Sequence, residues 1–402
     1  MRVLCVCLVG VLVCCVLGDS LCVVRGFLVS EVEVVESSLV LPDGSERRVR
    51  EVVGAVPTET AALFVNFGVN GVSYYRSLIP ARELRASLFI RDGEDLAVRS
   101  VVGAQDQPCV VYSMPREGFM LAEVAELLDR GVRVVADVDD WLRAFIGKSD
   151  HKNVEKYTEE FVSGFEGCLS VCDLVTCSTE FIAERVRGLG VPALVVPNAL
   201  DVERWSGCEF ANRVKNRAER RKLKSREPVF VGWSGSIGHE AAFREVVPAL
   251  ERVLAENAHV RFVSMGEDLG VLLNERFADR VLRLGYTPFP DHPKVISQFH
   301  VSLGPCLDDD FYRSKSDLRL LESWASGGVF VGGRATYGGS VEHGVDGFVC
   351  DNADDYYSAL TLLVNDDALR LRVSFAGRDR LLRDRTIGRV APLWREAICE
   401  GG

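Results

Sequence analysis

The sequence predicts an α/β protein with two doubly wound, Rossmann-like domains. Short apolar strands alternate with amphipathic helices in two series, over about 62–196 and about 229–331, and such alternation is typical of parallel sheets covered by helices. The length of 402 residues is sufficient for two cores of this kind. Residues 199–227 interrupt the alternation and separate the two series.

These patterns predict four parts of the chain. Residues 1–200 form an N-terminal domain that includes an unassigned, strand-rich extension over 1–58. Residues 201–227 are a basic linker, residues 228–375 form the second domain, and residues 376–402 are C-terminal helices. Ligands of doubly wound domains bind at the carboxyl ends of the strands.

In the first series, strands are predicted at 62–65, 110–112, 132–136, 174–177 and 194–196, and helices at about 117–130, 153–168 and 179–189. A glycine-rich turn that contains Gly68 and Gly71 follows the first strand, and Asp137 follows the third. In the extension, alternating apolar residues on both sides of the turn at 42–44 indicate a hairpin.

The first residues allow two interpretations. Met1 and Arg2 precede an apolar run that ends at Gly18, as in a signal peptide or anchor, but no Ala-x-Ala-like cleavage site follows. Buried strands would give the same pattern. The 13 cysteines lack paired Cys-x-x-Cys spacing, which favours small buried side chains in a reducing compartment. We expect a cytoplasmic protein and leave a signal or anchor at 1–18 as the alternative.

In the second series, strands are predicted at 229–233, 260–264, 281–284, 301–304 and 329–331, each separated from the next by a helix. The first of these helices carries apolar residues at three- and four-residue spacing: Phe243, Val246, Val247, Leu250, Val253 and Leu254. The tail over 366–399 is predicted to be helical, with Trp394 as a packing residue.

Residues 311–333 carry the strongest chemical signal. They predict a loop, a helix that begins near Ser316 as its N-cap and ends at Gly327, and then a buried strand. The helix N-terminus, together with Arg313 and Lys315, favours an anionic ligand such as phosphate. Glu322 could accept hydrogen bonds from a pair of sugar hydroxyls. The alternative is an ordinary amphipathic helix with a solvated charged face.

The charge balance argues against a surface for broad nucleic-acid binding. The net charge is −11, from 47 basic and 58 acidic residues. Residues 213–226 are strongly basic, but no aromatic side chains are interleaved for base stacking. A solvated linker is the favoured interpretation of this segment, and contact with an anionic acceptor or surface is the alternative.

Seven short motifs occur in a characteristic order over about 62–395. The series resembles the family-4-like nucleotide-sugar glycosyltransferases of bacteria and their phages, which have the GT-B architecture of two Rossmann-like domains facing across a cleft. The motifs are Gly71-Val-Ser-Tyr-Tyr-Arg76, Asp137-Val-Asp-Asp140, Ser178-Thr-Glu180, Val196-Pro-Asn198-Ala-Leu-Asp201, Gly232-Trp-Ser-Gly-Ser-Ile-Gly-His239, Lys315-Ser-Asp-Leu-Arg-Leu-Leu-Glu322 and Gly344-Val-Asp-Gly-Phe-Val349.

The resemblance implies that the second domain binds the nucleotide sugar. Glu322 corresponds to the second glutamate of a Glu-x7-Glu motif, which binds ribose hydroxyls, whereas Ser314 replaces the first glutamate. This departure leaves retention or inversion of the anomeric configuration open. The residues expected to hold the donor are Gly235, Ser236, His239, Arg313, Lys315, Ser316, Arg319 and Glu322. For His239, packing or capping at a helix start is the alternative.

On the acceptor side, the resemblance implies a loop formed by Gly68, Gly71, Tyr75 and Arg76. Catalysis is assigned to Lys315 and Glu322 together with Asp137 and Asp139 as candidate acceptor-side bases. A turn with helix-capping carboxylates is the alternative for the aspartates.

We expect no cofactor and no metal ion, because Arg313, Lys315 and Arg319 can balance a diphosphate. A glycosyltransferase is the preferred function. The alternatives are a non-catalytic nucleotide-sugar-binding protein and a Mg²⁺-dependent phosphotransferase or phosphatase that uses Asp137 and Asp139. The acceptor is a protein, a glycan or modified DNA, and contact with a membrane stays open.

Overall fold

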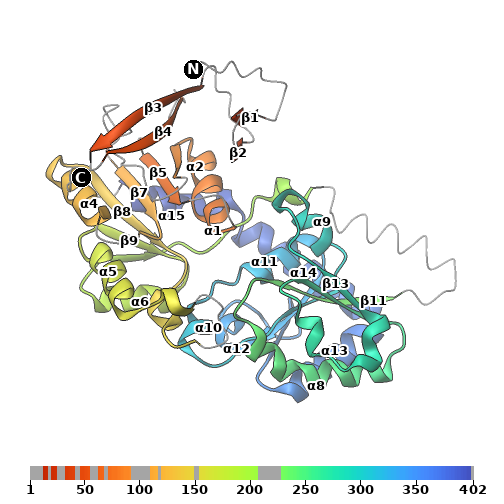
Figure 1. Cartoon of the computed structure of the whole chain (residues 1–402). Coiled ribbons are helices and arrows are strands. Elements are labelled where there is room, and N and C mark those ends of the chain that lie inside the picture. Colours follow the sequence, from red (N-terminus) through yellow and green to blue (C-terminus); the bar gives the residue numbers. More distant parts are fainter. Residues whose placement is uncertain are drawn as a thin grey trace. The chain divides into compact units, whose positions relative to one another are not determined.

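The computed structural model describes residues 12–16, 20–24, 32–40, 46–54, 62–67, 71–91, 109–115, 119–148, 154–206 and 228–399. The chain divides into two compact units (Figure 1). The first unit comprises residues 1–137, 167–175 and 394–402, and the second comprises residues 138–166 and 176–393. Gly68, the basic segment 213–226 and most of the linker lie outside the described residues.

The first large sheet has six strands in the order β10-β9-β8-β7-β5-β6. The strands are β5 (Ala62–Phe67), β6 (Ser87–Arg91), β7 (Cys109–Ser113), β8 (Arg133–Val138), β9 (Leu174–Cys177) and β10 (Ala193–Val195). β5 pairs in parallel with β6 and β7, and β7 with β8. Five of the six strands were predicted. β6 was missed because Arg85, a non-glycine residue with φ 51°, ends the preceding helix only two residues before the strand begins, so that no glycine or asparagine marks the boundary.

The helices of the first series lie close to their predicted places. After β5 the chain forms α1 (Gly71–Ser73), a π-helical turn (Tyr74–Leu78) and α2 (Ile79–Leu84). The others are α4 (Phe119–Asp129), α5 (Glu159–Ser170) and α6 (Glu180–Gly188). α6 begins after Thr179, whose hydroxyl accepts a hydrogen bond from the backbone N–H of Ile182.

Two short antiparallel pairs precede this sheet. β1 (Leu12–Val16) pairs with β2 (Ser20–Val24), and β3 (Val32–Val40) pairs with β4 (Glu46–Gly54). The second pair confirms the predicted hairpin. Of the proposed signal or anchor at 1–18, only the strand at 12–16 falls within the described residues. Among the described helices, none combines the length and the hydrophobicity that crossing a bilayer requires.

The second large sheet is parallel throughout, with the strand order β13-β12-β11-β14-β15-β16. Its strands are β11 (Val229–Gly235), β12 (Val260–Gly266), β13 (Val281–Leu284), β14 (Val301–Gly304), β15 (Val329–Gly333) and β16 (Phe348–Cys350). The first five confirm the predicted strands. β15 is buried along its whole length, because helices cover both faces of the sheet.

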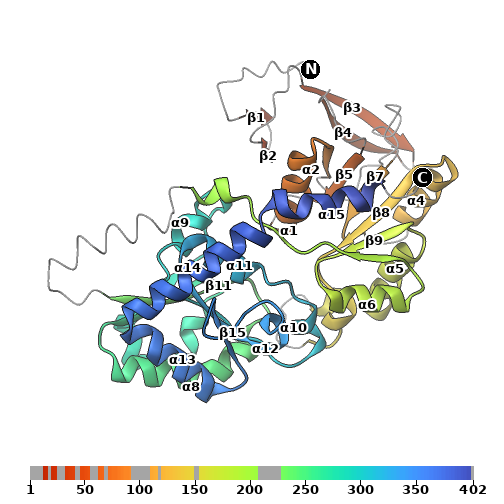
Figure 2. The same ribbon diagram turned by 180° about the vertical axis from the view of Figure 1, so that it is seen from behind.

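α8 (Glu240–Glu256) and α13 (Ala353–Asn365) pack together on one face of this sheet, and α9 (His292–Ile296) and α11 (Leu318–Ser326) cover the other (Figures 1 and 2). The prediction of a helix between β12 and β13 is wrong. Two 3-10 turns, Leu269–Leu272 and Glu275–Arg280, replace it, because the side chains of Asp268 and Asn274 cap tight turns there.

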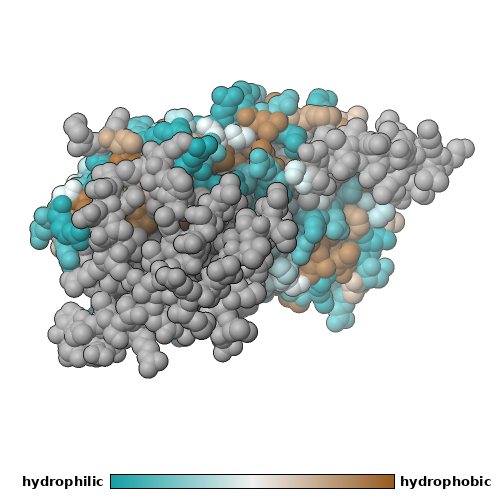
Figure 3. Space-filling model, turned by 90° about the horizontal axis from the view of Figure 1, so that it is seen from above, coloured by the Kyte–Doolittle hydropathy of each residue, from teal (hydrophilic) through white to brown (hydrophobic). Residues whose placement is uncertain are grey.

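The remaining helices follow the prediction of a helical tail. They are α14 (Asp367–Asp384) and α15 (Ile387–Cys399), and a short α12 (Arg334–Tyr337) follows β15. Within the first unit, Trp394 is buried with its ring centroid 5.5 Å from that of Phe64, which confirms its packing role. On the face of the molecule that Figure 3 shows, hydrophobic residues are interspersed with hydrophilic ones among the described residues, as is usual for a folded surface.

The predicted start of the helix near Ser316 is correct to within one residue, whereas the loop predicted before it is wrong. The segment expected as a loop forms α10 (Asp310–Ser314), because Asp309 accepts a hydrogen bond from the N–H of Tyr312 at 3.0 Å. Lys315 then adopts an extended conformation, and α11 begins at Leu318 with Asp317 in the N-cap position. The end at Gly327, with φ 77°, is as predicted.

Candidate functional site

A tight glycine turn lies at the carboxyl ends of two neighbouring strands. Gly235 ends β11 and Gly266 ends β12. Gly266 has φ +89°, and a Cβ at this position would lie 2.2 Å from the carbonyl oxygen of Gly235. A Cβ at Gly235 would lie 2.6 Å from Nη2 of Arg319. A side chain at Gly266 would collide with backbone in a conformation that favours glycine, and one at Gly235 would collide with Arg319 and Trp233, so that both glycines let neighbouring protein atoms approach closely. Ser236, which follows this turn, is exposed.

His239 lies at the start of α8, next to Arg319. The Nη2 atom of Arg319 is 3.1 Å from Nε2 of His239. A guanidinium group can only donate hydrogen bonds, so that Nε2 must accept and a neutral imidazole carries its proton on Nδ1. His239 is buried and packs near Phe311 and Tyr312, with ring centroids 6.1 Å and 5.7 Å away. It makes no side-chain cap hydrogen bond, so that packing describes it better than capping does.

Arg319 also affects the pKa of Tyr337. Burial raises the pKa of this phenol to about 12, although the charge and hydrogen bond of Arg319 act to lower it. The guanidinium therefore lies between a histidine and a tyrosine that stays protonated at neutral pH.

Lys315 has a defined position between two aromatic rings and a carboxylate. Its Nζ atom is 2.8 Å from Oδ1 of Asp140, and 4.7 Å and 4.5 Å from the ring centroids of Phe145 and Phe311. Phe311 also packs near His239. Lys315 and His239 thus lie near the same aromatic side chain, and Arg319 contacts His239.

Glu322 lies on the same face of α11 as Arg319, because the two residues are three positions apart. Its carboxylate is 3.2 Å from Nε2 of His292, and its side chain is only 9% exposed. Arg313 differs from the other predicted donor residues. It pairs with Asp308 at 2.8 Å and is largely exposed, so that a neighbouring carboxylate already balances its charge.

Ser314 and Ser316 both make internal hydrogen bonds. The hydroxyl of Ser314, in the position of the absent motif glutamate, is fully buried and donates to the carbonyl oxygen of Phe311 at 2.8 Å. Ser316 accepts a hydrogen bond from Nδ2 of Asn198 at 2.8 Å, and the same amide lies 3.1 Å from Oδ1 of Asp139. Asn198 therefore links the half-buried Asp139 to the segment between α10 and α11.

Asp317 is held by Arg385. The guanidinium binds both carboxylate oxygens, at 2.6 Å and 2.7 Å, and the hydroxyl of Ser340 donates to the same carboxylate at 2.6 Å. Burial acts to raise the pKa of Asp317, but the charge and hydrogen bonds of Arg385, with that of Ser340, hold it below its usual value. Arg385 also donates to the carbonyl oxygen of Asn198 at 2.7 Å.

The predicted acceptor-side residues of the first unit form a buried ion pair. Arg76 binds both oxygens of Asp137, at 2.5 Å and 3.1 Å, and the two side chains are 1% and 0% exposed. The Arg76 guanidinium lies 5.0 Å from the Trp394 ring. Tyr75 is buried, and Gly71 begins α1. Arg76 and Asp137 are thus close together but are not accessible to a ligand in this conformation.

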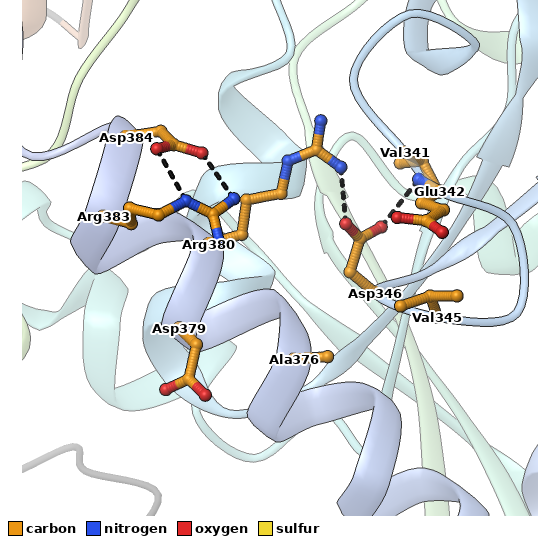
Figure 4. A pocket seen from close by; sticks show the side chains of 9 residues that line it. All are labelled: Val341, Glu342, Val345, Asp346, Ala376, Asp379, Arg380, Arg383 and Asp384. Atoms are coloured by element: carbon orange, nitrogen blue, oxygen red, sulfur yellow. Dashed lines mark hydrogen bonds and ion pairs between the residues drawn. The ribbon is translucent and has the colours of Figure 1, made fainter.

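A separate hollow of about 670 Å³ lies between α14 and the loop at 341–346 (Figure 4). Arg380 pairs there with Asp346 at 2.5 Å, and Arg383 with Asp384 at 2.8 Å. No predicted donor residue lines this hollow. Within the described residues, no three His, Cys, Asp or Glu side chains are arranged to hold a metal ion.

The sequence did not indicate several partners of the predicted residues. His292, Arg385 and Lys148 carry no local signal, whereas Asn198 and Asp140 belong to motifs that were noted without these contacts. Their partners lie as many as 187 residues away in the chain. Only the fold brings such pairs together.

Comparisons with known proteins agree with this architecture. No curated protein matches the sequence. HepE of Anabaena, solved in complex with UDP, superposes with a TM-score of 0.58 at 13% identity, covering 84% of this chain and 99% of HepE. Sucrose-phosphate synthase of Thermosynechococcus elongatus gives 0.61 at 12% identity, covering 85% and 100%. A UDP-forming trehalose-phosphate synthase of Burkholderia xenovorans gives 0.60 at 12% identity, covering 85% and 99%.

These structures share the GT-B fold, which confirms the predicted fold class. The family model described as Glycosyl transferases group 1 matches residues 228–366. The match spans β11 to α13 and includes the glycine turn, His239, Lys315, Arg319 and Glu322. Over residues 228–366, the chain is therefore similar to the group 1 glycosyl transferases.

Proposed function

We propose that the protein is a glycosyltransferase that moves a hexose from a nucleoside-diphosphate donor to an acceptor. The observation that carries the proposal is that Arg319 contacts His239, and that Lys315 and His239 pack near the same Phe311 ring, within the segment similar to group 1 glycosyl transferases. HepE has been solved with UDP and with UDP-glucose. These complexes support a uridine nucleotide as the first donor to test.

The donor site is assigned by charge and by chemistry. Lys315 and Arg319 hold the diphosphate and stabilise the charge that develops on it as the glycosidic bond breaks. The backbone of the glycine turn at Gly235 lies against the phosphates, and Glu322 binds the ribose hydroxyls. Because two cationic side chains are available, donor binding needs no divalent metal. The motif series supports placing the enzyme in the retaining, family-4-like branch, which the anomeric configuration of the product tests.

On the acceptor side, Asp139 is the better candidate of the two aspartates. It is half-buried and is held by Asn198, whereas Asp137 is enclosed with Arg76. We assign Asp137 to structure and Asp139 to the acceptor hydroxyl. The phosphotransferase alternative needs both carboxylates to act on one substrate, and neither the geometry nor the comparisons favour it.

Binding of uridine, UDP and UDP-glucose to two variants tests the donor site. Glu322→Gln loses the charge on the ribose contact and should weaken all three ligands by about 1–3 kcal/mol. Lys315→Ala should spare uridine and weaken the two diphosphates. It should also lower kcat more than donor affinity, because charge on the leaving diphosphate grows in the transition state. Isothermal titration and donor-turnover assays, each with and without a chelator, provide the measurements.

Lys294→Ala is the matched control, because Lys294 is an exposed lysine paired with Asp291 at 2.6 Å. It should behave like the parent protein. If Glu322→Gln and Lys315→Ala also behave like the parent, α11 is ordinary scaffold and the proposed function loses its support. Binding that disappears in chelator and returns with Mg²⁺ or Mn²⁺ would contradict the metal-free donor site.

A further inference from the structure

We infer that Asp140 is an internal counter-ion of Lys315 that occupies the place of a donor phosphate, and that donor binding displaces it. The inference rests on the proposed function, because it requires Lys315 to bind a diphosphate. The carboxylate of Asp140 lies 2.8 Å from the Lys315 ammonium group. The phosphate of an incoming donor therefore competes with a group that belongs to the protein itself.

Two aromatic rings and one carboxylate surround the Lys315 ammonium group. The rings of Phe145 and Phe311 lie 4.7 Å and 4.5 Å from Nζ and take up two of its sides. The Lys315 and Asp140 side chains are 23% and 28% exposed, so that the pair is partly accessible to solvent. An anion that binds there meets Asp140 at close range.

A carboxylate and a diphosphate cannot share one ammonium group at low cost. Both are negative, and the single positive charge of Lys315 cannot balance them together. The diphosphate carries more charge and gains the contacts of Arg319 and the glycine turn. Asp140 has no other hydrogen-bond or ion-pair partner among the described residues. The diphosphate should therefore displace the carboxylate.

Asp140 lies next to the proposed acceptor-side residue, so that its displacement from Lys315 affects the acceptor side. It directly follows Asp139, the proposed acceptor-side carboxylate, and precedes the 3-10 turn Leu142–Phe145. The ring of Phe145 packs edge-on against Phe311 at 4.9 Å. Release of Asp140 thus removes the polar contact between Asp140 and Lys315, which follows α10, and places a free carboxylate beside Asp139. Donor binding is thereby linked to the state of the acceptor side.

A neighbouring ion pair provides a matched control. Lys148 pairs with Asp309 at 3.1 Å and also lies 4.7 Å from the Phe311 ring. It joins the same two segments with the same two residue types, but neither of its members is assigned to the donor. Asp309→Asn removes the charge and keeps an oxygen that can cap α10.

The test is the affinity for UDP at fixed salt, measured by isothermal titration for the parent, Asp140→Asn, Asp309→Asn, Lys315→Ala and the double variant Asp140→Asn/Lys315→Ala. Removing a competing, partly exposed carboxylate should tighten UDP binding by about 1.5- to five-fold, the range measured for exposed ion pairs. Asp309→Asn should leave UDP affinity unchanged, and uridine should bind equally to the parent and to Asp140→Asn. In the Lys315→Ala background, Asp140→Asn should bring no gain.

The outcomes separate the two proposals. If Lys315→Ala weakens UDP binding but Asp140→Asn leaves it unchanged or weaker, the counter-ion role of Asp140 is wrong and the donor site stands. The same conclusion follows if Asp140→Asn tightens UDP binding equally with and without Lys315, or if Asp309→Asn gives the same gain. If Lys315→Ala binds UDP like the parent, the donor site itself fails.

Discussion

Asp317 illustrates how the fold sets the charge of one side chain. Burial favours the neutral carboxyl group, but the two hydrogen bonds from Arg385 more than offset this effect and lower the pKa. A group whose pKa is lower in the folded than in the unfolded state stabilises the fold above its unfolded pKa. That contribution is lost as the pH falls through the folded value. The Asp317–Arg385 pair should therefore stabilise the second unit at neutral pH and less in acid.

The variant Arg385→Met tests whether the Asp317–Arg385 pair stabilises the fold more at neutral pH than in acid. Removing one member of a buried pair leaves Asp317 as an uncompensated charge, and we expect a loss of about 3–5 kcal/mol in the free energy of unfolding at pH 7. The loss should shrink in acid, because Asp317 is then protonated. Urea unfolding of the parent and the variant, at pH 7 and in acid, measures the loss in the free energy of unfolding under each condition. Asp384→Asn, at an exposed pair with Arg383, is the control and should change little. An equal loss at both pH values would contradict the argument.

At the residue scale, the sequence can predict contacts between near neighbours in a site but not the distant partners of these residues. Arg319 and Glu322 are three residues apart, so that helix periodicity was enough to predict that they share one face of α11. Asp140 and Arg385 lie 175 and 68 residues from Lys315 and Asp317, respectively. No local pattern predicts such partners, because they depend on the packing of distant segments.

At the scale of elements, the contact between α11 and α14 depends on the absence of a side chain at Gly377. A Cβ there would lie 2.2 Å from the Trp324 ring. The indole cannot move aside easily, because it is buried and its Nε1 donates to the carbonyl oxygen of Asp346 at 2.8 Å. α11 carries Arg319 and Glu322, so that this packing also positions the candidate site.

We expect Gly377→Ala to destabilise the second unit by about 1–3 kcal/mol through overpacking. Gly188→Ala, at the last residue of α6, meets no atom within 4 Å. This control should be neutral or slightly stabilising, because alanine is the better helix former. Thermal unfolding of the two variants measures the contrast. Equal melting temperatures for parent and Gly377→Ala would show that the indole can shift without cost.

Elements could be predicted where burial leaves a regular pattern. The buried strands of the second sheet read as apolar runs, and α8 shows clear helical spacing. α10 has only five residues, too few for periodicity, and its start depends on one cap at Asp309. β16 also escaped prediction, because a strand of three residues gives almost no pattern of its own.

At the scale of the whole molecule, the repeated strand-helix alternation was sufficient to predict two parallel sheets, whereas the acceptor could not be predicted. The net charge of the chain argues against DNA as the acceptor. The chain carries −11 at neutral pH, so that it repels the phosphate backbone of DNA on average. An enzyme that acts on modified DNA would have to overcome this repulsion with a local basic surface.

We expect no appreciable binding to unmodified duplex DNA, with a Kd weaker than about 10⁻⁴ M, the upper end of the range for non-specific binders at physiological salt. Fluorescence anisotropy with a labelled duplex, at about 50 mM and 200 mM salt, measures it. A variant with serine in place of Arg221, Lys222 and Lys224 is the control and should behave like the parent. Micromolar binding that weakens steeply with salt and is lost in this variant would make the basic segment a nucleic-acid contact. It would also favour modified DNA over a protein or a glycan as the acceptor.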